Sequence, residues 1–320
     1  MLSRLAGRRI VFFGGKGGVG KTTLAAAYAV ASADRGERTL LVSTDPAHST
    51  GDILQCALDG DARDVVPNLR AIEIDPAQEA DRYIADVKRR IAETTSPRLL
   101  AEVERQIDIA RVTPGAEESA LFDRFAQILE RDGDDYDRLV FDTAPLGHTL
   151  RLLALPEQMH VWMQALIGRR KRVNALGRMW RSVAGAAAGD AGERDAVLDA
   201  LERRRARFAA ARTRLTDTAQ TAFVFVVVPE RLPILETERA VQALERHGIP
   251  VGAVMVNRVL PAEAAGDFMA RRRARERAYL ERIRTAFGRH EIVYVPLQEA
   301  DVVGITMLRD LAARAGTGEA

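Results

Sequence analysis

The sequence has one cysteine and no long apolar run, and these two scarcities exclude several classes of protein. Cys56 alone cannot form an intramolecular disulfide or an all-cysteine metal site. The longest strongly apolar run, residues 223–228, is far too short to cross a bilayer. The apolar stretch after the basic N-terminus ends at Gly14, which is too short for a signal peptide. We therefore expect a soluble protein of the cytoplasm.

An excess of charge of one sign is also lacking. The chain has 47 Lys and Arg residues against 45 Asp and Glu residues, so its net charge is only +2. This balance gives no electrostatic reason to expect that the protein binds nucleic acid or is anchored directly to a membrane. Only four of the 47 basic residues are lysines, and two of them, Lys16 and Lys21, lie in one glycine-rich stretch. That stretch is the first place to look for chemistry.

Short apolar runs alternate along the chain with longer helical patterns, which is typical of an α/β fold with a mostly parallel sheet. The runs are apolar at nearly every position, so we expect helices on both faces of the sheet. Helices are predicted at 21–35 and 236–246, each ending before a glycine. The predicted strands are 10–13, 39–43, 69–74, 138–141, 222–228, 251–256 and 292–295.

Residues 156–215 break this alternation, because they carry no strand signal and their apolar residues recur at helical spacing. We expect a helical subdomain here, inserted between two parts of one α/β core at 1–155 and 216–320. Its apolar stripe fits either packing on the core or a surface for an apolar client, which adaptable methionines would suit. The residues of this candidate client surface are Met159, Trp162, Met163, Leu166, Met179 and Trp180.

Residues 15–22 match the phosphate-loop pattern, with a predicted strand before them and a helix after them. Glycines let backbone N–H groups turn toward phosphate oxygens, and the helix N-terminus adds positive potential. Lys21 would neutralise the β- and γ-phosphates, and the Thr22 hydroxyl would bind Mg²⁺. Lys16, at the start of the loop, fits contact with the nucleotide of a neighbouring subunit. The predicted ATP-binding residues of the loop are Gly15, Lys16, Gly17, Gly18, Val19, Gly20, Lys21, Thr22 and Thr23.

Two aspartates follow predicted strands, Asp45 after 39–43 and Asp142 after 138–141. Ligands bind at the carboxyl ends of strands in open α/β sheets, so both carboxylates should lie near the phosphate loop. Asp142 fits the magnesium side, directly or through a water, and Asp45 fits the residue that orients the attacking water. A lone aspartate after a strand is commonly a turn residue, but two beside a phosphate loop favour function.

Taken in order over nearly the whole chain, these motifs resemble the ArsA family of deviant phosphate-loop ATPases, which includes the arsenical-pump ATPase and the ATPase that targets tail-anchored membrane proteins. The strings that carry the resemblance are 15–23, 45–49, 113–118, 142–153, 228–230, 236–239, 256–257 and 296–297. The resemblance implies a P-loop NTPase fold and a homodimer that closes around two ATP molecules. It also implies that Lys16 reaches the partner's phosphates and that Asp45 activates water.

Further roles are implied by the same resemblance. Glu230 and Asn257 would contact the nucleotide, with Asn257 reading the adenine, although from the residues alone Asn257 is simply a polar residue that ends a buried strand. Pro296 and Leu297 would line the base pocket. Switch residues would include His48, Gly147, His148 and Thr149.

Two departures from the family bear on its cargo. Family members that bind metalloid use several cysteines, whereas this chain has only Cys56, so arsenite or antimonite binding is disfavoured. The eukaryotic targeting members close a dimer zinc site with a CxxC motif, and no zinc is expected here because that motif is absent. Two roles stay open: energising the export of an arsenite-type anion through a membrane channel partner, or targeting tail-anchored membrane-protein clients.

A ParA/MinD-like positioning ATPase is the alternative, since that group shares the two-lysine loop. It has no support at the C-terminus, because residues 311–320 show no basic amphipathic membrane helix. The nitrogenase iron protein, another relative, is excluded by the missing cluster cysteines.

Overall fold

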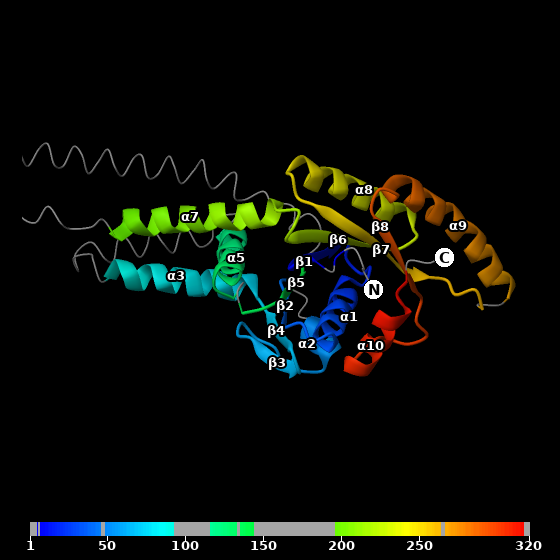
Figure 1. Cartoon of the computed structure of the whole chain (residues 1–320), viewed down its shortest axis with the longest axis horizontal. Coiled ribbons are helices and arrows are strands. Elements are labelled where there is room, and N and C mark those ends of the chain that lie inside the picture. The colour runs from blue at the N-terminus through cyan, green and yellow to red at the C-terminus, as the bar shows by residue number, and fades with distance from the viewer. Residues whose placement is uncertain are drawn as a thin grey trace, which may run out of the picture.

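The computed structural model describes residues 5, 7–45, 49–92, 116–132, 135–143, 196–263 and 266–316. Within them, one eight-stranded sheet has the order β3-β4-β2-β5-β1-β6-β7-β8, and only β3 runs antiparallel to its neighbour (Figure 1). The strands are β1 (Ile10–Gly15), β2 (Thr39–Ser43), β3 (Arg63–Val66), β4 (Leu69–Glu73), β5 (Arg138–Asp142), β6 (Thr221–Val227), β7 (Val251–Val259) and β8 (Glu291–Pro296).

All seven predicted strands are confirmed, with shifts of a few residues at their ends. Their continuous apolar character follows from burial on both faces, since every residue of β1, β2, β5 and β6 is buried. Strand β3 was not predicted. It is a short edge strand with Arg63 and Asp64 exposed, so its sequence lacks the apolar run that marks the others.

Alternate side chains of β1 enter two separate hydrophobic layers. Ile10 and Phe12 face one core, while Val11 and Phe13 face the other. The first core is closed by α5 (Ala116–Gln127), α7 (Ala196–Thr216), α8 (Arg231–Arg246) and α9 (Asp267–Phe287). The second is closed by α1 (Lys21–Asp34), α2 (Ser49–Leu54) and α10 (Ile305–Arg314). Helices therefore cover both faces of the sheet, as the sequence predicts.

Most of the phenylalanines lie in the first core. Phe12 lies in register with Phe141 of β5 and Phe223 of β6, its neighbours on either side. The three rings stack across the strands, with centroid distances of 4.8 Å and 5.8 Å from Phe12. Such stacks stabilise a sheet beyond the apolar area that they bury. They hold β1, which carries the phosphate loop, in the middle of the sheet.

Only the end of the predicted helical subdomain, residues 196–215, lies within the described residues, and it is helical as expected. It belongs to α7, which packs against the core through its C-terminal part and whose N-terminal part extends beyond the sheet alongside α3 (Pro76–Ala92) (Figure 1). Arg204 joins α7 to α3 and α5, since its guanidinium donates to the Tyr83 hydroxyl and to Ser119 and forms an ion pair with Asp123. The apolar stripe itself lies outside the described residues.

None of the helices in the described part of the chain combines the length and apolar character needed to cross a membrane.

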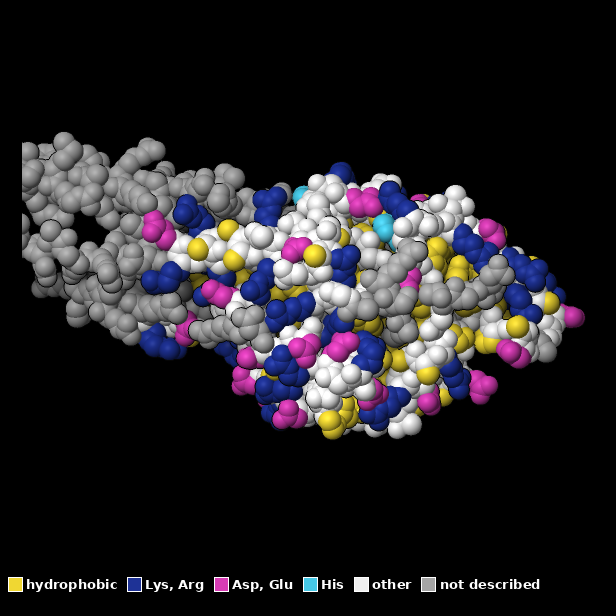
Figure 2. Space-filling view, in the orientation of Figure 1, with side chains coloured by type: hydrophobic (Ala, Val, Ile, Leu, Met, Phe, Trp, Pro, Cys, Tyr) yellow, Lys and Arg dark blue, Asp and Glu magenta, His cyan; other side chains and the backbone are white. Residues whose placement is uncertain are grey.

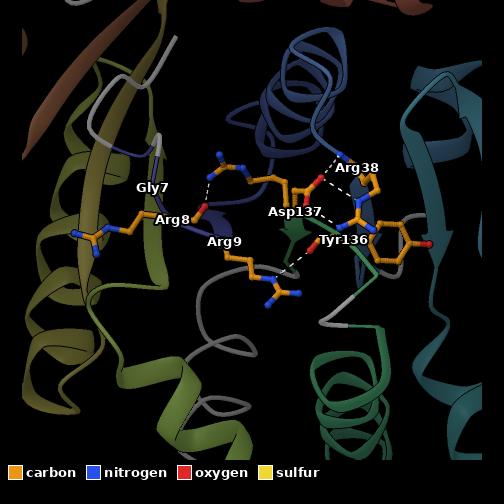
Figure 3. Close-up of a pocket in the computed structure, with 7 residues that line it drawn as sticks. Gly7, Arg8, Arg9, Arg38, Tyr136 and Asp137 are labelled. Carbon is orange, nitrogen blue, oxygen red and sulfur yellow. Dashed lines mark hydrogen bonds and ion pairs between the residues drawn. The ribbon is translucent and has the colours of Figure 1, made fainter.

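Arginines gather at the amino ends of the strands, around a cavity of about 390 Å³ (Figure 3). Arg38 contacts Asp137 there in an exposed ion pair, with a shortest distance of 2.8 Å. Arg138, by contrast, is 3% exposed. Its guanidinium donates to the carbonyl oxygens of Leu5 and Arg8 and pairs with Glu37 at 2.9 Å. The two arginines, one exposed and one buried, allow a matched test.

Replacing Arg138 by Met should lower the free energy of unfolding by about 3 kcal/mol, because two carbonyls and one carboxylate lose their buried donor. Urea denaturation measures this change. Arg38→Met is the control, and it should leave stability close to that of the wild type because its ion pair is solvent-exposed. Equal effects of the two substitutions would contradict the structural role assigned to Arg138.

Candidate nucleotide-binding site

The phosphate loop connects the end of β1 to the start of α1 and packs closely against its surroundings. A Cβ atom on Gly15 would lie 2.4 Å from the Val226 carbonyl oxygen of β6, so no larger residue fits there. Gly20 has a φ of +93° and caps the N-terminus of α1. The chain therefore turns sharply from strand to helix and leaves the first N–H groups of α1 without helical partners, which suits an anion.

Lys21 is the first residue of α1, and its side chain is only 4% exposed. Its ammonium nitrogen lies 3.8 Å from a carboxylate oxygen of Asp45, which follows β2. The structure thus brings together the lysine predicted to bind phosphate and the aspartate predicted to orient water. This places a positive and a negative charge at one edge of the sheet, beside the loop.

Asp142 ends β5 and is completely buried. Neither carboxylate oxygen has a hydrogen-bond partner of normal geometry among the described residues. Burial raises its pKa to about 7, with smaller contributions from the charges of Asp45 and Glu73, although the nearby Thr22 hydroxyl and Lys21 ammonium oppose the rise. A buried carboxylate without partners is a group that a bound cation would satisfy.

Thr22 supplies the second oxygen suited to a cation. It is buried in the first turn of α1, and its hydroxyl accepts a hydrogen bond of 3.3 Å from the Ser49 hydroxyl of α2. Among the described residues, no group of three or more His, Cys, Asp or Glu side chains is arranged to hold a metal. The residues present therefore fit Mg²⁺ bound by Thr22, waters and phosphate oxygens with Asp142 behind them, rather than a site built from protein ligands alone.

Glu73 is a site residue that the sequence analysis missed. It ends β4, is 7% exposed, and accepts a hydrogen bond of 3.2 Å from the Thr50 backbone N–H of α2. It thereby holds the helix that supplies Ser49 to Thr22. The signal was present in the sequence, because Glu73 is a carboxylate at the carboxyl end of an apolar strand, as Asp142 is.

Asn257, expected to read the adenine, lies against the phosphate loop. Its side-chain amide donates to the Val19 carbonyl oxygen at 2.8 Å, and its oxygen accepts from the Arg258 backbone N–H at 2.9 Å. A Cβ atom on Gly20 would lie 2.4 Å from the Asn257 amide nitrogen. The Asn257 amide therefore packs against the phosphate loop and binds its backbone. This contact follows from the position of β7 and was not expected from the sequence.

The other predicted nucleotide contacts follow neighbouring parallel strands at the same edge. Glu230 is an exposed residue that precedes α8, after β6. Pro296 ends β8, and the Leu297 backbone N–H donates to the Val259 carbonyl oxygen at 2.8 Å, which joins the ends of β7 and β8. The Leu297 side chain is 40% exposed. The base pocket that these residues would line stays a prediction.

Lys16, the second lysine of the loop, contacts α8. Its ammonium nitrogen lies 3.0 Å from a carboxylate oxygen of Glu236.

Other candidates fall outside the described residues, namely the switch residues His48, Gly147, His148 and Thr149 and the client-surface residues Met159, Trp162, Met163, Leu166, Met179 and Trp180.

Comparison with known proteins shows similarity over nearly the full chain. A family model described as anion-transporting ATPase (ArsA ATPase) matches residues 8–315. A relative from Aquifex aeolicus, named arsenical pump-driving ATPase 2, is 33% identical, covering 95% of this chain and 98% of the relative. An ATPase ASNA1 homolog 1 from Paramecium tetraurelia is 30% identical, covering 93% of this chain and 89% of its own length. The ATPase get3 of Aspergillus terreus is 34% identical, with 92% and 87% covered.

The raised pKa of Asp142 predicts how the stability of the ligand-free protein depends on pH. The folded protein keeps the proton up to about pH 7, whereas an unfolded aspartate loses it near 3.8. This contribution to stability is therefore complete below about pH 4 and is lost as the pH rises through 7, with a slope of about 1.4 kcal/mol per pH unit in between.

Asp142→Asn should abolish this pH dependence. Urea denaturation without nucleotide or magnesium should show the variant gaining stability relative to the wild type from pH 5 to pH 7, with no further change above pH 8. Comparing the two proteins at each pH cancels the other titrating groups. A constant difference across this range would show that Asp142 ionises normally.

Proposed function

Since the chain belongs to the ArsA family of anion-transporting ATPases and is an ATP hydrolase, we propose that it acts as a magnesium-dependent homodimer whose ATP cycle opens and closes a helical effector surface. The observation that carries this proposal is the set of Lys21, Asp45, Thr22 and Asp142 around the phosphate loop. Each member comes from the carboxyl edge of the sheet, and each has a part in phosphoryl transfer.

The chemistry requires little more than positioning and charge. The N–H groups of the loop and the Lys21 ammonium bind the β- and γ-phosphates and stabilise the charge that develops in the transition state. Asp45 orients the attacking water. Thr22 and Asp142, the latter directly or through a water, would hold magnesium, which would supply further neutralisation of the phosphate oxygens. Asp142 must give up its proton for this purpose, which the positive charge of the cation favours.

Lys16 completes the site from a second copy of the chain. Lys21 already occupies the inner face of the loop with only 4% of its side chain exposed, whereas 36% of the Lys16 side chain is exposed. An exposed lysine at the rim suits contact with the phosphates of a facing subunit. This division of roles supports the proposed dimerisation around two ATP molecules.

Coupling to the effector surface runs through the segments after β2 and β5. Asp45 and Asp142 sit at the starts of these segments, so the γ-phosphate can bias both at once. The segment after β5 leads into residues 156–215, which are predicted to form the helical subdomain, and α7 at the end of that range packs against the core. The contacts of Arg204 with α3 and α5 support transmission of a shift in this subdomain to the ATPase core.

Two downstream roles in the cytoplasm fit this cycle. The Aquifex relative is named an arsenical pump-driving ATPase, which supports an energiser of anion export with a membrane channel partner. The Aspergillus relative is named get3, and the resemblance to targeting ATPases supports shielding of an apolar membrane-protein helix. The single Cys56 disfavours a thiolate metalloid site, while the Met and Trp residues at 159–180 favour an apolar client.

Asp45→Asn should retain ATP binding and lose turnover by about 100-fold or more, because the variant cannot orient water through a carboxylate. Steady-state phosphate release and equilibrium binding of ATP measure the two effects. Asp52→Asn makes the same chemical change at an exposed position of α2 and serves as the control. Undiminished hydrolysis in the Asp45 variant would overturn the assignment.

The roles of pump energiser and targeting factor predict different results in two experiments. Stimulation of ATP hydrolysis by antimonite would identify a pump energiser. Co-purification of a hydrophobic helix that is lost on Met163→Asp would identify a targeting factor, because a charge in an apolar surface opposes binding. We expect the second result and no antimonite response.

A further inference from the structure

The ion pair between Lys16 and Glu236 joins two parts of the chain that are 220 positions apart. Topology explains their meeting. Strand β6 lies beside β1 and runs parallel to it, so the helix after β6 begins at the same edge of the sheet as the loop after β1. Glu236 lies in the second turn of that helix, α8, and its carboxylate reaches the rim of the phosphate loop.

The contact is specific to Glu236 among the acidic residues of this turn. Ile234 and Thr237 are buried against the sheet, which fixes how α8 is rotated. With this rotation, Glu238 faces α9 and pairs with Arg282 at 3.0 Å, while Glu236 faces Lys16. Two acids of one helix turn thus have separate partners, only one of them in the nucleotide site.

This pairing competes with the role proposed for Lys16. An ammonium held 3.0 Å from a carboxylate of its own subunit is partly neutralised and is directed toward α8. To contact the phosphates of a facing subunit, it must leave the carboxylate, and the released Glu236 charge would also repel those phosphates. The cost is small, because both side chains are more than a third exposed and solvent screens the pair.

We propose that Glu236 is a positioning residue that holds Lys16 on its own subunit until the nucleoside triphosphate bound by a second copy displaces the Glu236 carboxylate from Lys16. Dimer closure then consists of exchanging a carboxylate for a phosphate at each Lys16. The exchange sets how much nucleotide-loaded protein is needed for closure, and it keeps Lys16 from pairing with other anions beforehand. This inference rests on the proposed dimeric function and adds a residue that controls it.

The test measures the dissociation constant of the dimer by analytical ultracentrifugation, with Mg²⁺ and the non-hydrolysable analogue AMP-PNP. An exposed ion pair shifts an equilibrium by about two- to fivefold. Because two pairs break in each dimer, Glu236→Gln should lower the dissociation constant about 4- to 25-fold. Glu236→Asp should restore a dissociation constant near that of the wild type. The effect of Glu236→Gln should shrink as salt is raised from about 50 mM, where screening is weak, to about 500 mM, where screening is strong.

Glu238→Gln is the matched control, since it removes the same charge from the same helix turn but breaks a contact with α9, and its dissociation constant should equal that of the wild type. An unchanged or weaker dimer in Glu236→Gln would overturn the inference. The Lys16→Met variant separates this failure from failure of the proposed function. If Lys16→Met dimerises as well as the wild type, or if the wild type does not dimerise with AMP-PNP, the trans role of Lys16 and the inference both fall.

Discussion

Burial of the sheet on both faces is the constraint on which the rest of the structure depends. Helices occupy both sides of β1, β2, β5 and β6, so these strands tolerate polar side chains only at their ends. Seven of the eight strands in the described part of the chain are parallel, which brings their carboxyl ends to one edge. Polar groups from strands far apart in the sequence therefore meet there, and the phosphate loop after β1 lies at the centre of that edge.

The same burial leaves the charges at this edge unbalanced. Asp142, Asp45 and Glu73 contribute three carboxyl groups, against which Lys21 is a single buried ammonium. Burial is the main cause that raises the pKa of Asp142 to about 7, and the nearby charges of Asp45 and Glu73 add to the rise. A phosphate would improve the surroundings of Lys21, and a cation would improve those of Asp142. A phosphate bound alone would nevertheless add to the excess of negative charge at this edge, whereas a cation bound with it would offset that excess. This is a physical reason for the site to favour a magnesium–nucleotide complex over the nucleotide alone.

The sequence predicted the fold and two residues that the structure brings together beside the loop, because both are encoded locally. Continuous apolar runs marked the seven buried strands. Strand β3 was not predicted, because an exposed edge strand needs no such run. Lys21 and Asp45 were found through motifs that follow strands. The contacts of Asn257 and Glu236 depend instead on strand order, because β6 lies beside β1 and β7 lies beside β6, and local sequence does not contain that order. Contacts such as Asn257 with the Val19 carbonyl and Glu236 with Lys16 thus require the three-dimensional structure.

The two loop lysines illustrate how one residue type serves two tasks through burial. Lys21 is fixed, because its side chain is almost fully enclosed and its nearest charge, Asp45, is part of the same site. Lys16 is exposed and has an exchangeable partner on α8. Both tasks suit a compact ammonium, since a guanidinium would spread its charge over a planar fork and form a bidentate pair with Glu236 that is harder to release. In a chain whose basic residues are nearly all arginine, lysine at both positions fits the proposed roles of binding phosphate at a point and, at position 16, of releasing a carboxylate first.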